Sequence, residues 1–122
     1  MTLYESFLEA VTTEYDTLRV LKQSPRGTVS VVRHKKSGTR YVFRRYSGSG
    51  EVYRRLLPVL CPHLPQIMEA AEQDGQTAVL EEYVQGDTLA ELLMGARLTE
   101  REARQVTMQL CQALHVLHSM GA

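Results

Sequence analysis

The chain has 122 residues, of which 43% are hydrophobic and 23% are charged, and its formal net charge is zero. This composition fits one globular domain, or part of a larger one, and excludes a mostly disordered chain. It gives no general attraction to nucleic acid or to an anionic membrane. Neither a membrane-spanning run nor a signal peptide is visible, so we expect a cytoplasmic protein with Cys61 and Cys111 reduced.

Five segments have the alternation and composition of strands, and turn-forming residues separate several of them at hairpin lengths. These expected strands cover residues 18–23, 28–34, 39–46, 66–71 and 77–82. Asp74-Gly75 has the composition of a tight hairpin turn between the last two. The pattern therefore predicts an antiparallel sheet.

Apolar residues recur at helical spacing in the other segments. We expect helices over residues 2–11, 51–60 and 88–93, and a longer one from residue 99. Thr2 with Glu5 and Thr99 with Glu102 have the spacing of capping boxes, whereas Pro58 disturbs the end of the second helix. The residues expected to face inward are Leu3, Phe7, Leu8 and Val11, then Val52, Leu56, Val59 and Leu60, and then Ala103, Val106, Leu110, Ala113, Leu114 and Leu117.

Residues 79–89 connect a mostly strand-forming part of the chain to a helical part. An apolar strand here runs through Gly86 into the helix expected near Thr88. A crossover between two differently built halves is a usual place for a cleft, and clefts hold ligands.

The order of these elements resembles the amino-terminal lobe of a eukaryotic-type, bacterial-like Ser/Thr protein kinase, continued into the carboxy-terminal lobe. Residues 61–65 (CPHLP) are similar to the family's His-Pro-Asn-Ile turn, residues 79–84 (VLEEYV) to its hinge, and residues 114–121 (LHVLHSMG) to the run before its catalytic loop. The order and spacing of the three motifs carry the resemblance.

This resemblance implies an α+β fold, with a five-stranded antiparallel sheet, one packed helix and then two helices of the second lobe. It divides the chain into an amino-terminal helix or extension over residues 1–14, a kinase-like lobe over 15–84, and an incomplete second lobe over 85–122.

The resemblance places a phosphate-covering loop at the first hairpin. Aligned with G-x-G-x-x-G-x-V, the chain keeps Gly27 and Val29 but has Lys22 and Ser24 where the first two glycines stand. Glycines allow backbone amides to approach phosphate oxygens, and Lys22 could partly substitute by charge. An ordinary hairpin turn is the plain alternative for this segment.

The third strand holds Tyr41-Val42-Phe43-Arg44 at the V-A-I-K position, so Arg44 replaces the phosphate-contacting lysine. Strand alternation puts Val42 on the face of Arg44, where Val42 and Val29 would enclose an adenine ring. Arginine is a planar fork and not a compact ammonium, so the exchange is not conservative. A solvated cation on a half-exposed strand is the alternative.

Two acidic residues are candidate partners of Arg44. Glu51 is the acidic residue of the next helix, although it would equally well begin that helix favourably against the dipole. Glu81 lies on the cleft face just before the hinge and could pair with Arg44 across the back of the pocket. The hinge residues implied to lie near adenine and ribose are Glu82, Val84, Asp87 and Thr88.

In a complete parent protein, the resemblance implies transfer of the ATP γ-phosphate to protein Ser/Thr hydroxyls with Mg²⁺. The 122 residues contain neither H-R-D-x-x-x-x-N nor D-F-G, so we expect this chain alone to be inactive and at most to bind nucleotide. Its partners would be ATP and a protein substrate or the rest of the second lobe. Arg44 and the depleted glycine loop favour a pseudokinase or truncated regulatory module as the alternative. A non-nucleotide interaction domain would need only the packed sheet.

Overall fold

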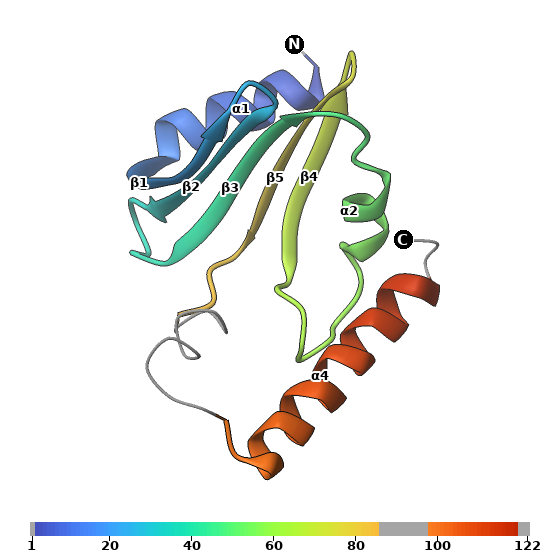
Figure 1. Ribbon diagram of the computed structural model, residues 1–122. Coiled ribbons are helices and arrows are strands. Elements are labelled where there is room, and N and C mark those ends of the chain that lie inside the picture. Colours follow the sequence, from blue (N-terminus) through green and yellow to red (C-terminus); the bar gives the residue numbers. More distant parts are fainter. Residues whose placement is uncertain (1, 86–97, 120–122) are drawn as a thin grey trace. The chain divides into compact units, whose positions relative to one another are not determined.

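The computed structural model describes residues 2–85 and 98–119, which form helices and strands in the order drawn in Figure 1. The elements are α1 (Leu3–Glu14), β1 (Tyr15–Ser24), β2 (Gly27–His34), β3 (Arg40–Ser47), α2 (Glu51–Leu56), β4 (Ile67–Gln73), β5 (Gln76–Glu82) and α4 (Glu100–Ser119). They group into two compact units, one of Met1–Leu60 with Pro65–Tyr83 and one of Cys61–Leu64 with Val84–Ala122.

The first unit is built on a five-stranded sheet in the order β1-β2-β3-β5-β4, in which all neighbouring strands are antiparallel (Figure 1). The β4–β5 turn forms where Asp74 and Gly75 both adopt positive φ, at 52° and 76°. Two consecutive residues with positive φ make the turn that matches the twist of a hairpin. β5 lies between two strands, and its Ala78 and Val79 are completely buried. The predicted antiparallel sheet is confirmed.

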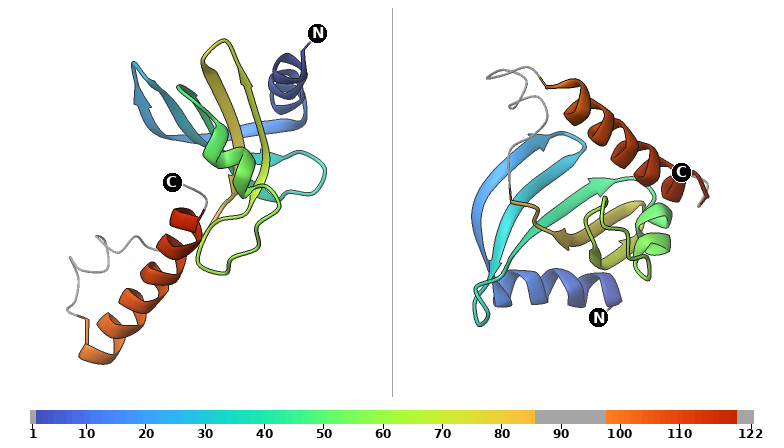
Figure 2. Two further views of the ribbon diagram at one scale, coloured as in Figure 1. Left: turned by 90° about the vertical axis from the view of Figure 1, so that its right-hand side faces the viewer. Right: turned by 90° about the horizontal axis from the view of Figure 1, so that it is seen from below.

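The strand register sorts the side chains onto two faces. Val42 lies opposite Val31 and Glu81 on one face, whereas Phe43 lies opposite Ser30 and Leu80 on the other. Helix α1 lies along one face of the sheet, and α2 lies near β4 on the opposite face (Figure 2). The ring of Phe7 on α1 contacts that of Phe43, so α1 covers the face of Phe43. We call these the α1 face and the α2 face.

Helix α1 packs on the sheet as the sequence predicts, but with a different inward stripe. Its capping box between Thr2 and Glu5 is present, and the ring of Phe7 meets that of Phe43 edge-on at 5.9 Å. The buried positions are Tyr4 and Val11, whereas Leu3 is 88% exposed. The expectation for Leu3 is therefore wrong, because the helix turns Tyr4, seven residues from Val11, toward the sheet.

Helix α2 is shorter than predicted. It ends at Leu56, just before Pro58, which has no amide hydrogen and restricts the conformation of the preceding residue. None of its residues is buried, and both Val52 and Leu60, which were expected to face inward, are exposed. The inward stripe predicted for this segment is therefore wrong for these two residues. Leu60 lies beyond the end of the helix, where helical spacing no longer applies.

The described part of the second unit contains helix α4. Its capping box is present, because the Thr99 amide donates to Glu102 Oε1 and the Glu102 amide donates to Thr99 Oγ1, each at 3.1 Å. Of the predicted apolar stripe, Ala113 is buried but Leu110 and Leu114 are exposed. The helix predicted over residues 88–93 lies outside the described residues. No helix within residues 2–85 and 98–119 has the length and apolar character needed to cross a membrane.

Candidate functional site

A pocket of about 400 Å³ opens between the β1–β2 hairpin, the end of β3 and helix α2. We call it the hairpin pocket. Its lining residues are Lys22, Ser24, Arg26, Gly27, Thr28, Val29, Arg44, Arg45, Tyr46 and Tyr53. The pocket thus brings together Lys22, Ser24, Gly27, Val29 and Arg44, which were assigned to a ligand from the sequence.

One row of cross-strand neighbours forms part of this pocket. Lys22 on β1 lies opposite Val29 on β2, and Val29 lies opposite Arg44 on β3. Residues directly opposite each other in an antiparallel pair project from the same face of the sheet. The apolar Val29 is therefore flanked by a cationic residue on each neighbouring strand.

Gly27 has a structural reason of its own to be glycine. A Cβ atom there would lie 2.0 Å from the carbonyl oxygen of Arg45 and 2.7 Å from Cα of Tyr46. The Ser47 amide also donates to the carbonyl oxygen of Arg26 at 2.9 Å, which holds the hairpin tip against the end of β3. The close approach of β2 and β3 requires glycine whether or not a ligand binds.

The lining of the hairpin pocket is basic. Among the described residues, it includes Lys22, Arg26, Arg44 and Arg45 and no acidic residue. Within the described ranges, no carboxylate lies within ion-pair distance of Lys22, Arg26 or Arg45. A concave surface lined by one sign of charge raises the local concentration of ions of the opposite sign. The pocket is therefore suited to an anion.

Arg44 differs from the other basic residues because it has a carboxylate partner. Its Nε and Nη2 atoms both lie 2.8 Å from Oε1 of Glu81, on β5. The Glu81 side chain is 8% exposed and that of Arg44 is 37% exposed. The contact hypothesised between these two residues is thus present, and it provides the buried carboxylate with the partner that it needs.

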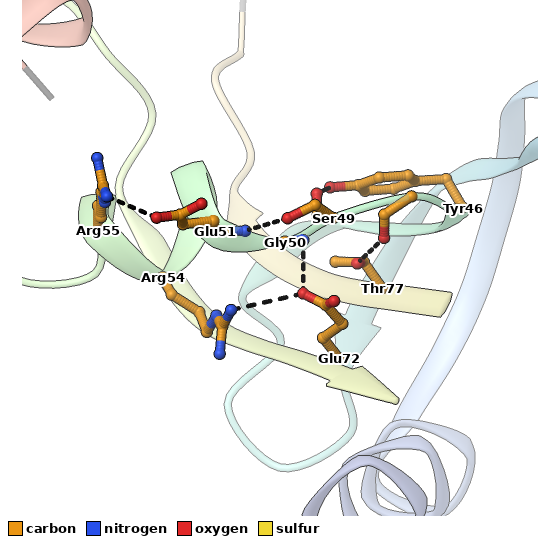
Figure 3. A network of polar contacts seen from close by, with 9 residues as sticks. Tyr46, Ser49, Gly50, Glu51, Arg54, Arg55, Glu72 and Thr77 are labelled. Carbon is orange, nitrogen blue, oxygen red and sulfur yellow. Dashed lines mark hydrogen bonds and ion pairs between the residues drawn. The ribbon is translucent and has the colours of Figure 1, made fainter. Parts of the chain in front are cut away.

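Glu51 does not serve as this partner. Its carboxylate pairs with Arg55 one turn later in α2, at 2.5 Å, and its amide donates to Ser49 Oγ at 3.2 Å (Figure 3). Of the two roles left open by the sequence, the structure shows an acidic residue that begins the helix. The pairing of Glu51 with Arg44 is wrong in this conformation, because Arg44 is bonded to Glu81.

The start of α2 is held by side chains that the sequence did not single out (Figure 3). Oε1 of Glu72 accepts a hydrogen bond from the Gly50 amide at 2.9 Å and lies 3.5 Å from Nη2 of Arg54. The Thr77 hydroxyl donates to the carbonyl oxygen of Gly48 at 2.6 Å. Glu72 and Thr77 are cross-strand neighbours on the α2 face, so together they hold the backbone just before α2, at Gly50 and Gly48. Only their pairing across the sheet reveals this role, because no sequence motif marks either residue.

Two tyrosines form the aromatic side of the hairpin pocket, with ring centroids 6.1 Å apart. The Tyr46 hydroxyl donates to the carbonyl oxygen of Ser49 at 2.7 Å. Burial raises the pKa of Tyr46 and outweighs the neighbouring Thr77 hydroxyl, which acts in the opposite direction. Tyr46 is therefore a neutral hydrogen-bond donor at physiological pH. Neither Tyr46, Tyr53 nor Arg26 was assigned from the sequence, because no motif marks them.

The remaining described residues that were assigned from the sequence do not line the hairpin pocket. Val42 is buried beside Glu81, and the amide of Glu82 donates to the carbonyl oxygen of Gln66 at 2.8 Å. Val84 belongs to the second unit and is exposed. The last two, Asp87 and Thr88, lie outside the described residues.

No group of three or more His, Cys, Asp or Glu side chains in the described part of the chain is placed to hold a metal ion. None of the described residues that line the hairpin pocket is acidic. The described residues therefore offer no carboxylate ligand for Mg²⁺ at this pocket.

No protein-family model matches the chain. Among solved structures, it is similar to Rad53 residues 1–466 in complex with AMP-PNP, with a TM-score of 0.75 and 19% identity over 97% of this chain and 35% of that chain. It is also similar to the PknI kinase domain of Mycobacterium tuberculosis, with a TM-score of 0.64 and 22% identity over 89% of this chain and 50% of that chain. The predicted fold is confirmed: the chain has an α+β fold like the amino-terminal part of a protein kinase. It spans half or less of these matched chains.

Proposed function

We propose that this chain is a nucleotide-binding part of a protein kinase-like protein and that it holds ATP on the α2 face of its sheet. The observation that carries the proposal is the convergence of Lys22, Ser24, Gly27 and Val29 on one basic pocket. A concave site whose described charged lining residues are all cationic suits a polyphosphate. The similar structure of Rad53 contains AMP-PNP, which supports this choice of ligand.

The complete parent protein would use the bound nucleotide to phosphorylate Ser or Thr hydroxyls of a protein substrate. Mg²⁺ would neutralise charge on the phosphates there, held by residues other than those of the hairpin pocket. The 122 residues contain neither an H-R-D-x-x-x-x-N nor a D-F-G motif, so we propose binding without phosphoryl transfer for this chain alone. We also propose a cytoplasmic location, which agrees with the free thiols of Cys61 and Cys111.

One observation favours a second candidate, a pseudokinase or nucleotide-dependent regulatory module. Arg44 is bonded to Glu81, and the helix carboxylate of Glu51 is bonded to Arg55. In active protein kinases a strand cation must pair with a helix carboxylate to position the phosphates. Here the strand cation and the helix carboxylate each pair with a different residue. This arrangement suits binding and regulation better than catalysis.

Thermal unfolding of the chain with ATP, ADP or adenosine, each with and without Mg²⁺, tests the proposal. We expect ATP and ADP to raise the midpoint in a concentration-dependent manner, because a ligand of the folded state stabilises it by mass action. The shift should persist without Mg²⁺, because the pocket supplies the positive charge. If neither ATP nor ADP at millimolar concentration shifts the midpoint and calorimetry detects no binding, nucleotide binding is wrong and the interaction-domain alternative stands.

A further inference from the structure

We propose that Arg26 and Lys22 of the β1–β2 hairpin hold the phosphates of the ligand, and that Arg44 is withheld from them by Glu81. The ligand class, a nucleotide polyphosphate, rests on the proposed function. The division of labour between the basic residues does not follow the V-A-I-K pattern, in which the β3 cation contacts the phosphates.

The first step of the argument is the state of Arg44. Two of its N–H groups point to the same oxygen of Glu81, at 2.8 Å each. The carboxylate is nearly buried and has no second cation within ion-pair distance among the described residues. Movement of Arg44 toward a phosphate would leave that carboxylate charged and unpaired, which is strongly unfavourable. Glu81 therefore both neutralises Arg44 and holds it in place.

The second step concerns the two hairpin residues. Lys22 and Arg26 line the pocket, both are exposed, and neither has a carboxylate within ion-pair distance in the described ranges. Lys22 stands opposite Val29, on the face of the sheet that carries Arg44. The backbone of Arg26 is anchored to β3 through the Ser47 amide, so its guanidinium extends from a fixed point. These charges are free to bond an anion without breaking an existing ion pair.

The chain compensates in this way for the altered glycine loop. With Lys22 and Ser24 at two glycine positions and Pro25 without an amide hydrogen, fewer backbone donors are available to phosphate. Cationic side chains can replace backbone amides because charge-assisted hydrogen bonds are stronger than neutral ones. We therefore expect anion binding to depend on Arg26 and Lys22 and to weaken as salt increases.

Titration calorimetry with sodium tripolyphosphate, ATP and adenosine tests this division. R26Q and K22Q should each weaken tripolyphosphate and ATP binding by about tenfold, the order expected for one charged hydrogen bond. The double variant R44Q/E81Q removes the ion pair without leaving a buried charge, and its affinity should stay within about twofold of the wild type. The matched control R40Q removes an equal charge from an exposed position of β3 outside the pocket and should also stay within about twofold.

E81Q keeps the inference testable if the double variant does not fold. It leaves Arg44 without its neutralising partner, so tripolyphosphate should bind at least as tightly as to the wild type. The inference is overturned if E81Q binds tripolyphosphate more weakly than the wild type does. It is also overturned if R44Q/E81Q loses as much affinity as R26Q. Either result would mean that Arg44 contacts the ligand in the position in which Glu81 holds it.

The outcomes separate this inference from the proposed function. If tripolyphosphate binds in a way that depends on Arg26 and Lys22 but ATP does not bind, the anion site is supported and the proposed nucleotide binding is refuted. Binding of ATP that is unchanged in R26Q and K22Q supports the proposed function and overturns the inference. Failure of the wild type to bind tripolyphosphate also overturns it.

Discussion

The ion pair between Arg44 and Glu81 leads to a prediction about folding stability: removing one partner should cost more than removing the other. Arg44→Gln leaves a carboxylate whose side chain is 8% exposed, whereas Glu81→Gln leaves a guanidinium whose side chain is 37% exposed. A buried charge without a partner is costly, while an exposed charge regains hydration. We therefore expect Arg44→Gln to destabilise the fold more than Glu81→Gln.

The expected losses in the free energy of unfolding follow from this difference in burial. Breaking a fully buried pair costs about 3–5 kcal/mol, and because Arg44 is partly exposed and screened, we expect about 2–3 kcal/mol for Arg44→Gln. Glu81→Gln retains a hydrogen-bond acceptor for the arginine and should cost only about 1 kcal/mol. The double variant should be less unstable than the sum of the two, with a coupling energy of about 1–2 kcal/mol.

Urea denaturation followed by circular dichroism measures these free energies of unfolding. All four proteins of the double-mutant cycle should be compared at one pH at which carboxylates are ionised, and Arg40→Gln provides the charge-matched control. The reasoning would be refuted if the two single variants were equally stable, or if their effects added to within about 0.5 kcal/mol, as independent sites do.

Three further predictions concern Gly27, the start of α2 and the capping box of α4. Gly27→Ala should destabilise the fold by at least about 2 kcal/mol in urea denaturation, because a Cβ there would lie 2.0 Å from a β3 carbonyl oxygen. Glu72→Ala should increase hydrogen exchange at the Gly50 amide, with a loss of about 1 kcal/mol, because that amide loses its acceptor. Hydrogen bonds from the Thr99 backbone and side chain lower the pKa of Glu102, so Thr99→Ala should raise that pKa partway toward its ordinary value in a carboxyl NMR titration. Since the folded pKa is lowered, the capping-box contribution is present above the unfolded pKa and is lost as the pH falls through the folded pKa.

The prediction for Gly27 has a control within the chain, and each of the other two has a result that would contradict it. Gly38 has positive φ and open space around it, so Gly38→Ala measures backbone strain alone and should cost less than Gly27→Ala. Unchanged protection at Gly50 in the Glu72 variant would contradict the role of Glu72. An unchanged pKa of Glu102 after Thr99→Ala would show that the hydroxyl does not support the ionised carboxylate.

Local patterns were sufficient to predict much of the architecture. Alternating apolar residues and turn residues such as Asp74-Gly75 predicted the strands within a few residues of their observed ends, because a hairpin depends on contacts close in sequence. The capping boxes at Thr2 and Thr99 form for the same reason. Lys22 and Val29 line the hairpin pocket because the β1–β2 turn and the pairing of these two strands place them opposite each other.

Other features depend on contacts between residues distant in sequence. The sequence offered Glu51 and Glu81 as partners of Arg44, and the choice was made by the pairing of β3 with β5, which brings Glu81 to the arginine. Glu72 likewise accepts a hydrogen bond from the Gly50 amide at the start of α2 because β4 lies at the edge of the sheet, next to that helix. A charged side chain can reach several partners in an unfolded chain, and the register of the folded sheet selects one because a buried charge must be paired. Periodicity and turn chemistry thus determine which strands form, whereas the packed sheet decides which charges are neutralised and which remain free to bind a ligand.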